Sequence, residues 1–123
     1  IKIMGIDIGT TTVSIVMADT ETGKLLARET VEQIFFAEPE QKLQDPERIY
    51  EIIRELLAKL QKENGSPDGI GFTGQMHGML YVDVCGKAVS PLYTWQDGSG
   101  EIPLENGKTC AELLQGVGAA DMV

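Results

Sequence analysis

The chain has 123 residues, enough for one small domain with a single core. It carries 10 Lys and Arg residues against 19 Asp and Glu residues, which gives a net charge of −9. Such an acidic chain repels the phosphates of nucleic acids and of anionic membranes, which argues against both as partners. Because no apolar run approaches the about 20 residues of a membrane span and no signal peptide is evident, we expect a cytoplasmic protein.

The two cysteines, Cys85 and Cys110, are far apart and form no C-x-x-C motif. Two buried or partly buried free thiols in a reducing compartment are the favoured interpretation, ahead of a disulfide or a metal site. The chain has one histidine, so it lacks the ligand clusters that structural metal sites require.

The first segments of the chain predict strands. Residues 1–8 form a nearly continuous apolar run, which predicts a central strand covered on both faces. Residues 12–18 are rich in strand-forming side chains, and residues 25–31 have a similar composition beyond a polar turn at 19–24. Together the three segments predict an antiparallel meander.

A long amphipathic helix follows. Asp45 is a suitable N-cap and precedes a proline, whereas Gly65 follows an asparagine as a stop signal. The apolar residues between these ends recur at helical spacing, namely Ile49, Ile52, Ile53, Leu56, Leu57 and Leu60. Glu55 and Lys59 are spaced to pair with each other on the opposite side of the helix.

The later segments complete the predicted order of elements. Residues 69–73 predict a short strand that pairs parallel with the first strand. Residues 79–84 and 88–89 predict a hairpin, and residues 109–114 predict the start of a second helix. The predicted fold class is therefore α/β, with a three-stranded antiparallel meander, a helix, a parallel strand and a hairpin.

The first motif that could bind a ligand or take part in catalysis, G-I-D-I-G-T-T-T, begins at Gly5. Asp7 ends a buried strand, where a carboxylate is costly without a partner, and it is suited to hold Mg²⁺ through water. The backbone N–H groups and hydroxyls of the turn that follows suit phosphate oxygens, and the turn residues are Gly9, Thr10, Thr11 and Thr12. A plain hairpin with an exposed Asp is the alternative. The motif is not G-x-x-x-x-G-K-S/T, which excludes a P-loop.

The second motif, T-G-Q-M-H-G, directly follows the predicted parallel strand, where α/β sheets place ligand groups. The amide of Gln75 and the ring nitrogens of His77 both suit sugar hydroxyls, which need donors as well as acceptors. Met76 lies between them. A structural histidine in a glycine-rich turn is the alternative that the motif alone favours.

The third motif is Y-T-W-Q-D-G, beginning at Tyr93. Trp95 is suited to stack on a sugar, and Asp97 to orient or brace a pocket. A core tryptophan at a strand end is the alternative.

The order of these motifs resembles one known superfamily. A D-x-G-T-T turn after the first strand of a meander, followed by a helix and a parallel strand, resembles the first phosphate loop of the actin-like ATPases, which share a ribonuclease-H-like half-domain. The G-Q-M-H-G and W-Q-D-G strings resemble the sugar-binding segments of FGGY carbohydrate kinases, closest to the xylulokinase- and sedoheptulokinase-like ketose kinases. Ser99 departs from the family pattern, which often has Arg there.

The resemblance implies that residues 1–123 are the incomplete amino-terminal domain of a kinase that phosphorylates a sugar with ATP and Mg²⁺. The sugar would be a ketose such as xylulose or sedoheptulose. Asp7 would organise the metal and the turn the phosphates, and the expected sugar-binding residues are Gln75, Met76, His77, Trp95 and Asp97. The general base and the adenosine pocket are expected beyond Val123, so the chain alone should be inactive. A homodimer of the full-length protein is compatible with the family.

Two other classes of function stay open. A non-catalytic sugar-binding or regulatory module could keep only this half of the kinase fold. An actin-like or chaperone ATPase would share the phosphate turn, but the G-Q-M-H-G and W-Q-D-G strings argue against it, since such a site has no sugar to bind.

Overall fold

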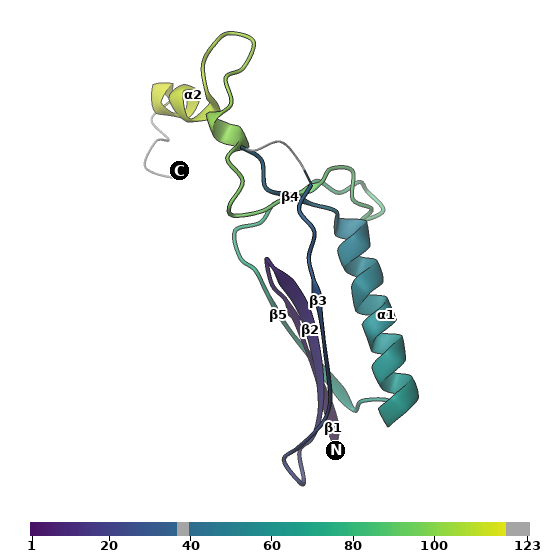
Figure 1. Ribbon diagram of the computed structural model, residues 1–123. Coiled ribbons are helices and arrows are strands. Elements are labelled where there is room, and N and C mark those ends of the chain that lie inside the picture. Colours follow the sequence, from purple (N-terminus) through teal and green to yellow (C-terminus); the bar gives the residue numbers. More distant parts are fainter. Residues whose placement is uncertain (37–39, 118–123) are drawn as a thin grey trace.

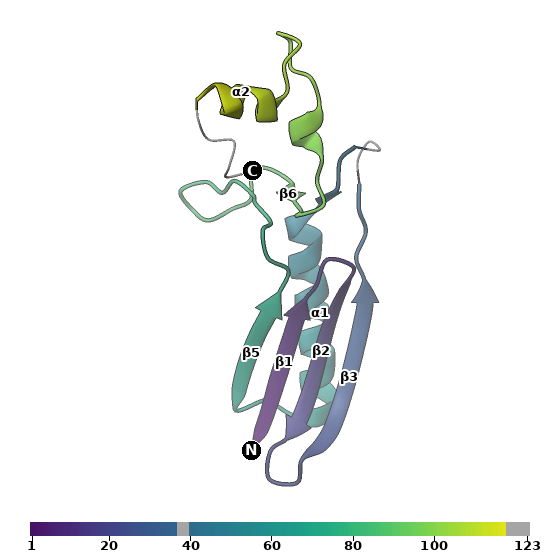
Figure 2. The same cartoon turned by 90° about the vertical axis from the view of Figure 1, so that its left-hand side faces the viewer.

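The core of the structure is a four-stranded sheet (Figures 1 and 2). The computed structural model describes residues 1–36 and 40–117. The strands of the sheet are β1 (Lys2–Ile8), β2 (Thr12–Asp19), β3 (Lys24–Glu32) and β5 (Gly69–Gly74), in the spatial order β3-β2-β1-β5. β1 pairs antiparallel with β2 and parallel with β5, and β2 pairs antiparallel with β3. The predicted meander, the parallel strand and the α/β class are thus confirmed.

A single long helix, α1 (Pro46–Asn64), covers one face of this sheet. The Asp45 side chain accepts a hydrogen bond from the Glu47 N–H at 2.9 Å, and Gly65 has a φ of 81°, so both predicted helix ends are confirmed. The apolar stripe of the helix packs on inward side chains of the strands, and the buried cluster comprises Met4, Ile6, Val13, Ile15, Met17, Ile49, Ile52, Leu56 and Leu60. Full burial of each such large side chain contributes about 1.5–3 kcal/mol.

The predicted ion pair on the outer side of α1 is wrong. Lys59 binds Glu29 of β3, and this hydrogen bond raises the pKa of Lys59. The Oε1 atom of Glu55 instead lies 3.8 Å from the Nη1 atom of Arg48. Because α1 packs over β3 as well as β2, a partner from another element is available to Lys59, and helical spacing does not reveal it.

The other face of the sheet is open. Figure 2 looks onto this face, with α1 behind the strands. Ile3 and Asp7 of β1 are exposed on it, whereas Met4 is buried beneath α1. The prediction that residues 1–8 are covered on both faces is therefore wrong. No helix or strand in the part of the chain that the structure describes packs on the open face of β1. β5 extends the open face with Thr73, which is in register with Asp7. Its Phe72 is in register with the buried Ile6 and so lies on the α1 side of the sheet, where it is 68% exposed because α1 packs mainly over β2 and β3.

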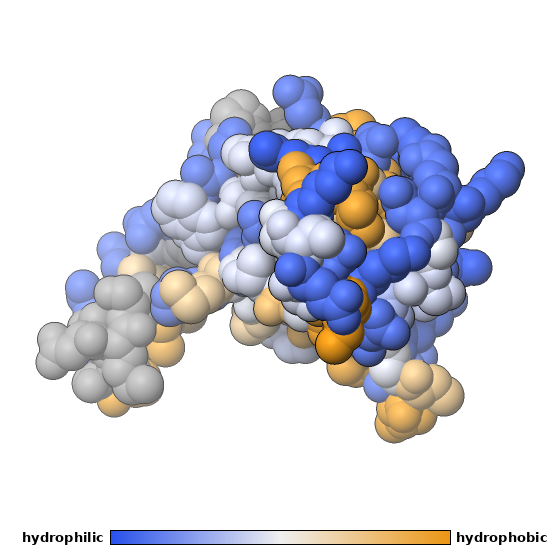
Figure 3. All heavy atoms as spheres, turned by 90° about the horizontal axis from the view of Figure 1, so that it is seen from below, coloured by the Kyte–Doolittle hydropathy of each residue, from blue (hydrophilic) through white to orange (hydrophobic). Residues whose placement is uncertain are grey.

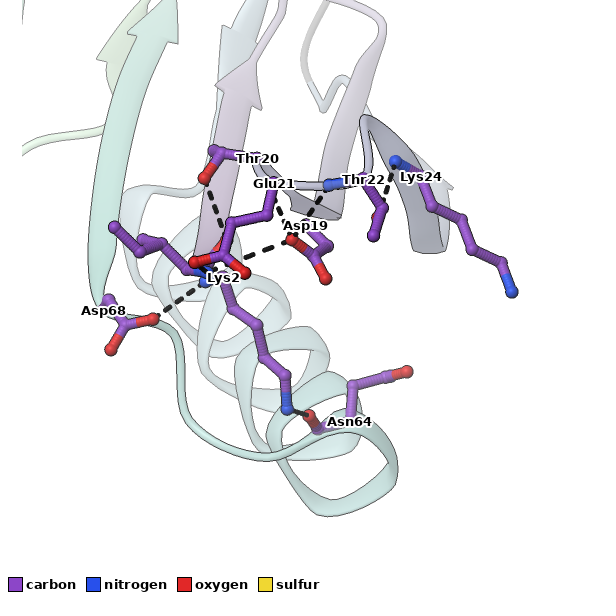
Figure 4. Close-up of polar contacts among 9 residues, drawn as sticks. Lys2, Asp19, Thr20, Glu21, Thr22, Lys24, Asn64 and Asp68 are labelled. Carbon is purple, nitrogen blue, oxygen red and sulfur yellow. Dashed lines mark hydrogen bonds and ion pairs between the residues drawn. The ribbon is translucent and has the colours of Figure 1, made fainter.

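The end of the sheet that carries the β2–β3 turn is held together by short polar contacts (Figure 4). The Lys2 side chain donates to the Asn64 carbonyl at 2.6 Å, and its backbone N–H donates to Asp68 at 2.8 Å. Asp19 accepts the Glu21 N–H at 2.9 Å, a bond that lowers the pKa of Asp19. Seen from this end, the surface is mainly hydrophilic, with hydrophobic residues exposed between the polar ones (Figure 3). The two hydrogen bonds of Lys2 hold the C-terminal end of α1, and the loop that follows it, against β1.

The opposite end carries the three motifs. Two short strands, β4 (Leu43–Gln44) and β6 (Leu92–Tyr93), pair antiparallel there. A 3-10 turn (Ser99–Glu101) and α2 (Cys110–Gly116) follow, and α2 projects beyond the sheet (Figure 1). The predicted second helix is confirmed, with a capping box at its start.

The predicted hairpin has no regular strands. Residues 79–89 form a loop in which one isolated bridge joins Val82 to Ala88. Cys85 and Cys110 are free, as expected, but both are exposed rather than buried, because they lie in this loop and on the projecting α2. Within the described part of the chain, no helix is long and apolar enough to cross a membrane.

Candidate functional site

The β1–β2 turn has its carbonyl groups bound by the protein. The Gly9 N–H donates to the Thr12 carbonyl at 2.9 Å and closes the turn. Gln33 holds the turn from β3's end: its side-chain amide donates to the Gly9 carbonyl at 2.7 Å, and its N–H donates to the Thr11 carbonyl at 2.7 Å. A Cβ atom at Gly9 would lie 3.0 Å from the Thr12 carbonyl oxygen. Glycine is therefore needed here for close approach.

The same turn presents free N–H groups. The Gln44 side chain donates to the Thr10 carbonyl at 2.7 Å, so the fourth turn carbonyl is bound as well. Among the described residues, the N–H groups of Thr10 and Thr11 donate to no protein acceptor. A turn whose carbonyls are bound and whose N–H groups are free suits an anion such as a phosphate.

Asp7 lies next to this turn, at the end of β1. Its carboxylate is exposed on the open face, level with Ser14 of β2 and Thr73 of β5. It lines a groove of about 680 Å³ that runs along this face. Exposure removes the desolvation cost that a strand-end carboxylate would otherwise have.

This arrangement fits a hydrated Mg²⁺ with phosphates. Mg²⁺ usually takes one or two carboxylates and keeps several waters, and Asp7 supplies one exposed carboxylate beside free amide donors. In residues 1–36 and 40–117, no three His, Cys, Asp or Glu side chains gather to hold a metal.

A closed ring of hydrogen bonds joins the turn to the second motif. The Thr10 hydroxyl donates to Gln75 Oε1 at 3.1 Å, Gln75 Nε2 donates to Gln44 Oε1 at 3.0 Å, and Gln44 Nε2 donates back to the Thr10 carbonyl. The indole N–H of Trp95 donates to the Thr10 hydroxyl oxygen at 2.9 Å. The three motifs thus meet at Thr10.

The second motif turns sharply after β5. A Cβ atom at Gly74 would lie 2.9 Å from the Ile8 carbonyl oxygen, which accepts the Gln75 N–H at 2.8 Å. His77 has a φ of 60°, a conformation that costs a residue with a Cβ about 1–2 kcal/mol. Met76 is 73% exposed. Glycine at 74 lets the chain cross the end of β1 closely, and the side chains that follow project from the sheet's end.

Gln75 and His77 line a hollow of about 340 Å³ at the start of α1, with apolar walls from Ile8, Pro46, Ile49, Leu80 and Leu92. This hollow and the groove at Asp7 share no lining residue. Asp7 therefore lines the groove and His77 lines the hollow, and the two are separate concavities at the same end of the sheet.

Asp97 braces the third motif. Its carboxylate accepts the Lys42 N–H at 2.9 Å and the Ser99 N–H at 3.1 Å. Partial burial opposes ionisation of Asp97, but these hydrogen bonds outweigh it and lower the pKa of the carboxyl. Trp95 is 57% exposed, so part of its ring is accessible from solvent.

Two site residues, Gln33 and Gln44, cannot be recognised from the sequence. Gln44 is 1% exposed, although it lies in a polar stretch whose composition predicts a loop. Their partners are 24 and 34 residues away along the chain, so no local spacing signals them. The one cue is that each glutamine borders a predicted element.

Comparison with known proteins places the chain among sugar kinases. Residues 2–108 match the family described as "FGGY family of carbohydrate kinases, N-terminal domain". The xylulose kinase of Staphylococcus epidermidis is 28% identical over 99 residues, which are 77% of this chain and 20% of that protein. The gluconokinase of Bacillus subtilis is 28% identical over 101 residues, which are 80% of this chain and 20% of that protein. The chain thus spans about a fifth of the length of these curated relatives.

Solved structures share the fold. The ligand-bound xylulose kinase of Lactobacillus acidophilus superposes with a TM-score of 0.80 over 98% of this chain and 24% of that chain, at 22% identity. The gluconate kinase of the same organism gives a TM-score of 0.78 over 98% of this chain and 23% of that chain, at 23% identity. The chain therefore has the actin-like ATPase fold of the matching part of these kinases.

Proposed function

The chain belongs to the FGGY family of carbohydrate kinases, and we propose that it supplies the phosphate turn and part of the sugar pocket to an ATP-dependent sugar kinase. One observation carries the proposal: free turn N–H groups, an exposed carboxylate and the Gln75–His77 segment lie together where β1 and β5 end. This is the edge at which α/β sheets bind ligands. ATP would supply the phosphoryl group, and Mg²⁺ would neutralise its charge.

The residues of the chain would act mainly by positioning. The N–H groups of Thr10 and Thr11 would hold phosphate oxygens, and they need little reorganisation because the turn carbonyls are already bound. Asp7 would orient the metal through its waters. Gln75, Met76 and His77 would hold the sugar, with Trp95 as one wall and Asp97 as its brace. Alignment of donor and acceptor of this kind accounts for most catalysis of phosphoryl transfer.

A ketose is the favoured acceptor, since the G-Q-M-H-G string resembles the segment that contacts the ketose in xylulokinase-like enzymes. The relatives named xylulose kinase support it. The relative named gluconokinase makes a sugar acid the second candidate. We place the general base and the adenosine pocket in the part of the kinase that this chain does not span, and the protein in the cytoplasm, where its free cysteines stay reduced.

The test is a coupled ADP-release assay on the full-length kinase with ATP, Mg²⁺ and a panel of ketoses, aldoses, gluconate and glycerol. We expect ADP release that depends on one ketose or a few related ketoses. ATP hydrolysis that is indifferent to sugar would indicate an actin-like or chaperone-type ATPase instead. Sugar binding by calorimetry without any turnover would indicate a non-catalytic module.

A further inference from the structure

Gln44 is a buried side chain with both ends of its carboxamide in use. It is 1% exposed, and its backbone is fixed by the pairing of β4 with β6 opposite Leu92. Its Nε2 donates to the Thr10 carbonyl at 2.7 Å, and its Oε1 accepts from Gln75 at 3.0 Å. A buried amide of this kind is costly unless paired, so removing it leaves two partner groups unsatisfied.

The donor directions in the ring are fixed by the backbone carbonyl of Thr10. A carbonyl can only accept, so Gln44 presents Nε2 to Thr10 and Oε1 to Gln75. Gln75 then donates with Nε2, and its Oε1 accepts from the Thr10 hydroxyl, whose oxygen accepts from the Trp95 indole N–H. Each bond depends on the next, and four segments that are distant in the sequence meet in one network.

We propose that Gln44 is a positioning residue that couples the phosphate turn to the sugar segment, so that the phosphoryl donor and its acceptor are set relative to each other by one buried carboxamide. The inference rests on the proposed function for the identity of the two ligands. The hydrogen-bond ring itself does not depend on it. Gln44 contacts both sides, Thr10 of the turn and Gln75 of the sugar segment.

Gln33 provides the contrast. It binds the Gly9 and Thr11 carbonyls and none of the residues of the sugar segment. Loss of Gln33 should therefore disturb the phosphate turn alone, whereas loss of Gln44 should disturb both ligands. Gln61, exposed on α1 with no side-chain hydrogen bond among the described residues, is the matched control.

The first measurement tests the ring in the 123-residue chain. The chain has one tryptophan, so its ¹⁵N–¹H spectrum contains one indole signal. Gln44→Met keeps the side-chain volume but removes both hydrogen bonds, and it should move the Trp95 indole signal, because both side chains bind Thr10. Gln61→Met should leave that signal in place. An unmoved indole signal in a folded Gln44→Met chain would overturn the inference.

The second measurement tests coupling in the full-length kinase, with D-xylulose and with ADP plus Mg²⁺ as calorimetric probes. Gln44→Met should weaken binding of both probes and lower kcat by about tenfold to 100-fold, the scale on which misplacement of reacting groups acts. Gln33→Met should weaken binding of ADP alone. Loss of binding for only one probe in Gln44→Met would overturn the coupling.

A third variant tests the assigned bond directions. Gln44→Glu keeps an acceptor for Gln75 but has no donor for the Thr10 carbonyl when ionised, so it should weaken ADP binding more than D-xylulose binding. Equal losses would overturn the assigned bond directions. A wild-type enzyme that binds none of the sugars in the ADP-release panel would count against the proposed function, and the indole measurement would still decide whether the ring exists.

Discussion

His77 combines an unfavourable backbone conformation with an exposed imidazole. Its φ of 60° lies in the left-handed region, where glycine is the ordinary residue. The segment has glycine at positions 74 and 78, yet it has histidine at position 77, where the backbone conformation favours glycine. A strained residue of this kind is a signature of a functional side chain.

His77→Ala should raise the KM for the sugar roughly threefold to tenfold, because a lost hydrogen bond to a hydroxyl costs about 0.5–1.5 kcal/mol. The KM for ATP should stay within about twofold. His77→Gly should lose the same sugar affinity yet unfold at a higher temperature than His77→Ala, since glycine relieves the positive φ. Steady-state kinetics and thermal unfolding of the two full-length variants check this. A raised ATP KM with an unchanged sugar KM would show that the segment is assigned to the wrong ligand.

We expect Asp7 to act on the metal and phosphates of ATP and not on the sugar. Asp7→Asn keeps the shape of the side chain but removes the charge that would orient the metal, so kcat should fall about 100-fold or more. The sugar KM should change little, because the groove at Asp7 and the hollow at His77 share no lining residue. The measurement is kcat at saturating ATP and Mg²⁺. Normal turnover under these conditions would remove Asp7 from the mechanism.

At the scale of elements, β5 and β1 cross closely where the second motif begins. Gly74→Ala would place a Cβ atom 2.9 Å from the Ile8 carbonyl oxygen, and relief of that contact should cost about 1–3 kcal/mol. Gly71→Ala in the same strand is the control, because a Cβ atom there meets nothing within 4 Å. Its stability should change by no more than about 0.5 kcal/mol. Urea unfolding compares the two, and equal destabilisation would show that the crossing does not constrain residue 74.

The loop that Asp97 braces should respond to acid. Hydrogen bonds lower the pKa of Asp97 below its ordinary value of 3.8, so its contribution is complete above that pH and is lost as the pH falls through the folded-state pKa. Asp97→Asn should therefore be less stable than wild type at pH 7 by about 1 kcal/mol. The difference should shrink below pH 3.8. Denaturant unfolding at a series of pH values measures it, and a difference that grows towards low pH would have the wrong sign.

Local signals predict the elements that depend on local contacts. The caps at Asp45 and Gly65 and the apolar stripe between them define α1 because a helix is stabilised by neighbours three and four residues away. The predicted hairpin at 79–89 is shorter than its composition indicates: one antiparallel bridge joins Val82 to Ala88, because Met79 at the start of the segment pairs with Tyr93 instead. Asp7, Gln75 and Trp95 are recognisable as motifs, but Gln44 is not, since its burial arises from contacts distant in the sequence.

At the scale of the whole molecule, apolar side chains are uncovered on both sides of the β1–β5 edge. Ile3 is 46% exposed on the open face, whereas Ile70 and Phe72, in register with Met4 and Ile6, are 45% and 68% exposed on the α1 side. The free edge of β5 carries no charged residue to discourage pairing. An apolar run in β1 signals burial, but it does not say which segment provides the cover. The xylulose kinase of Staphylococcus epidermidis and the gluconokinase of Bacillus subtilis are each about five times as long as the part that this chain matches.

We propose a division of labour in which this chain holds the phosphates and one wall of the sugar pocket, while the rest of the kinase supplies the general base and the adenosine pocket. In-line transfer requires both reactants to be held and water to be excluded, and a missing general base alone lowers the rate by about 10²–10⁴-fold. The most direct test is ADP release by the purified 123-residue chain, with ATP, Mg²⁺ and the sugar that the full-length kinase prefers. We predict a folded chain whose ADP release equals the no-protein background. Sugar-dependent turnover above that background, in a sample free of other kinases, would place the base within these 123 residues and contradict the account.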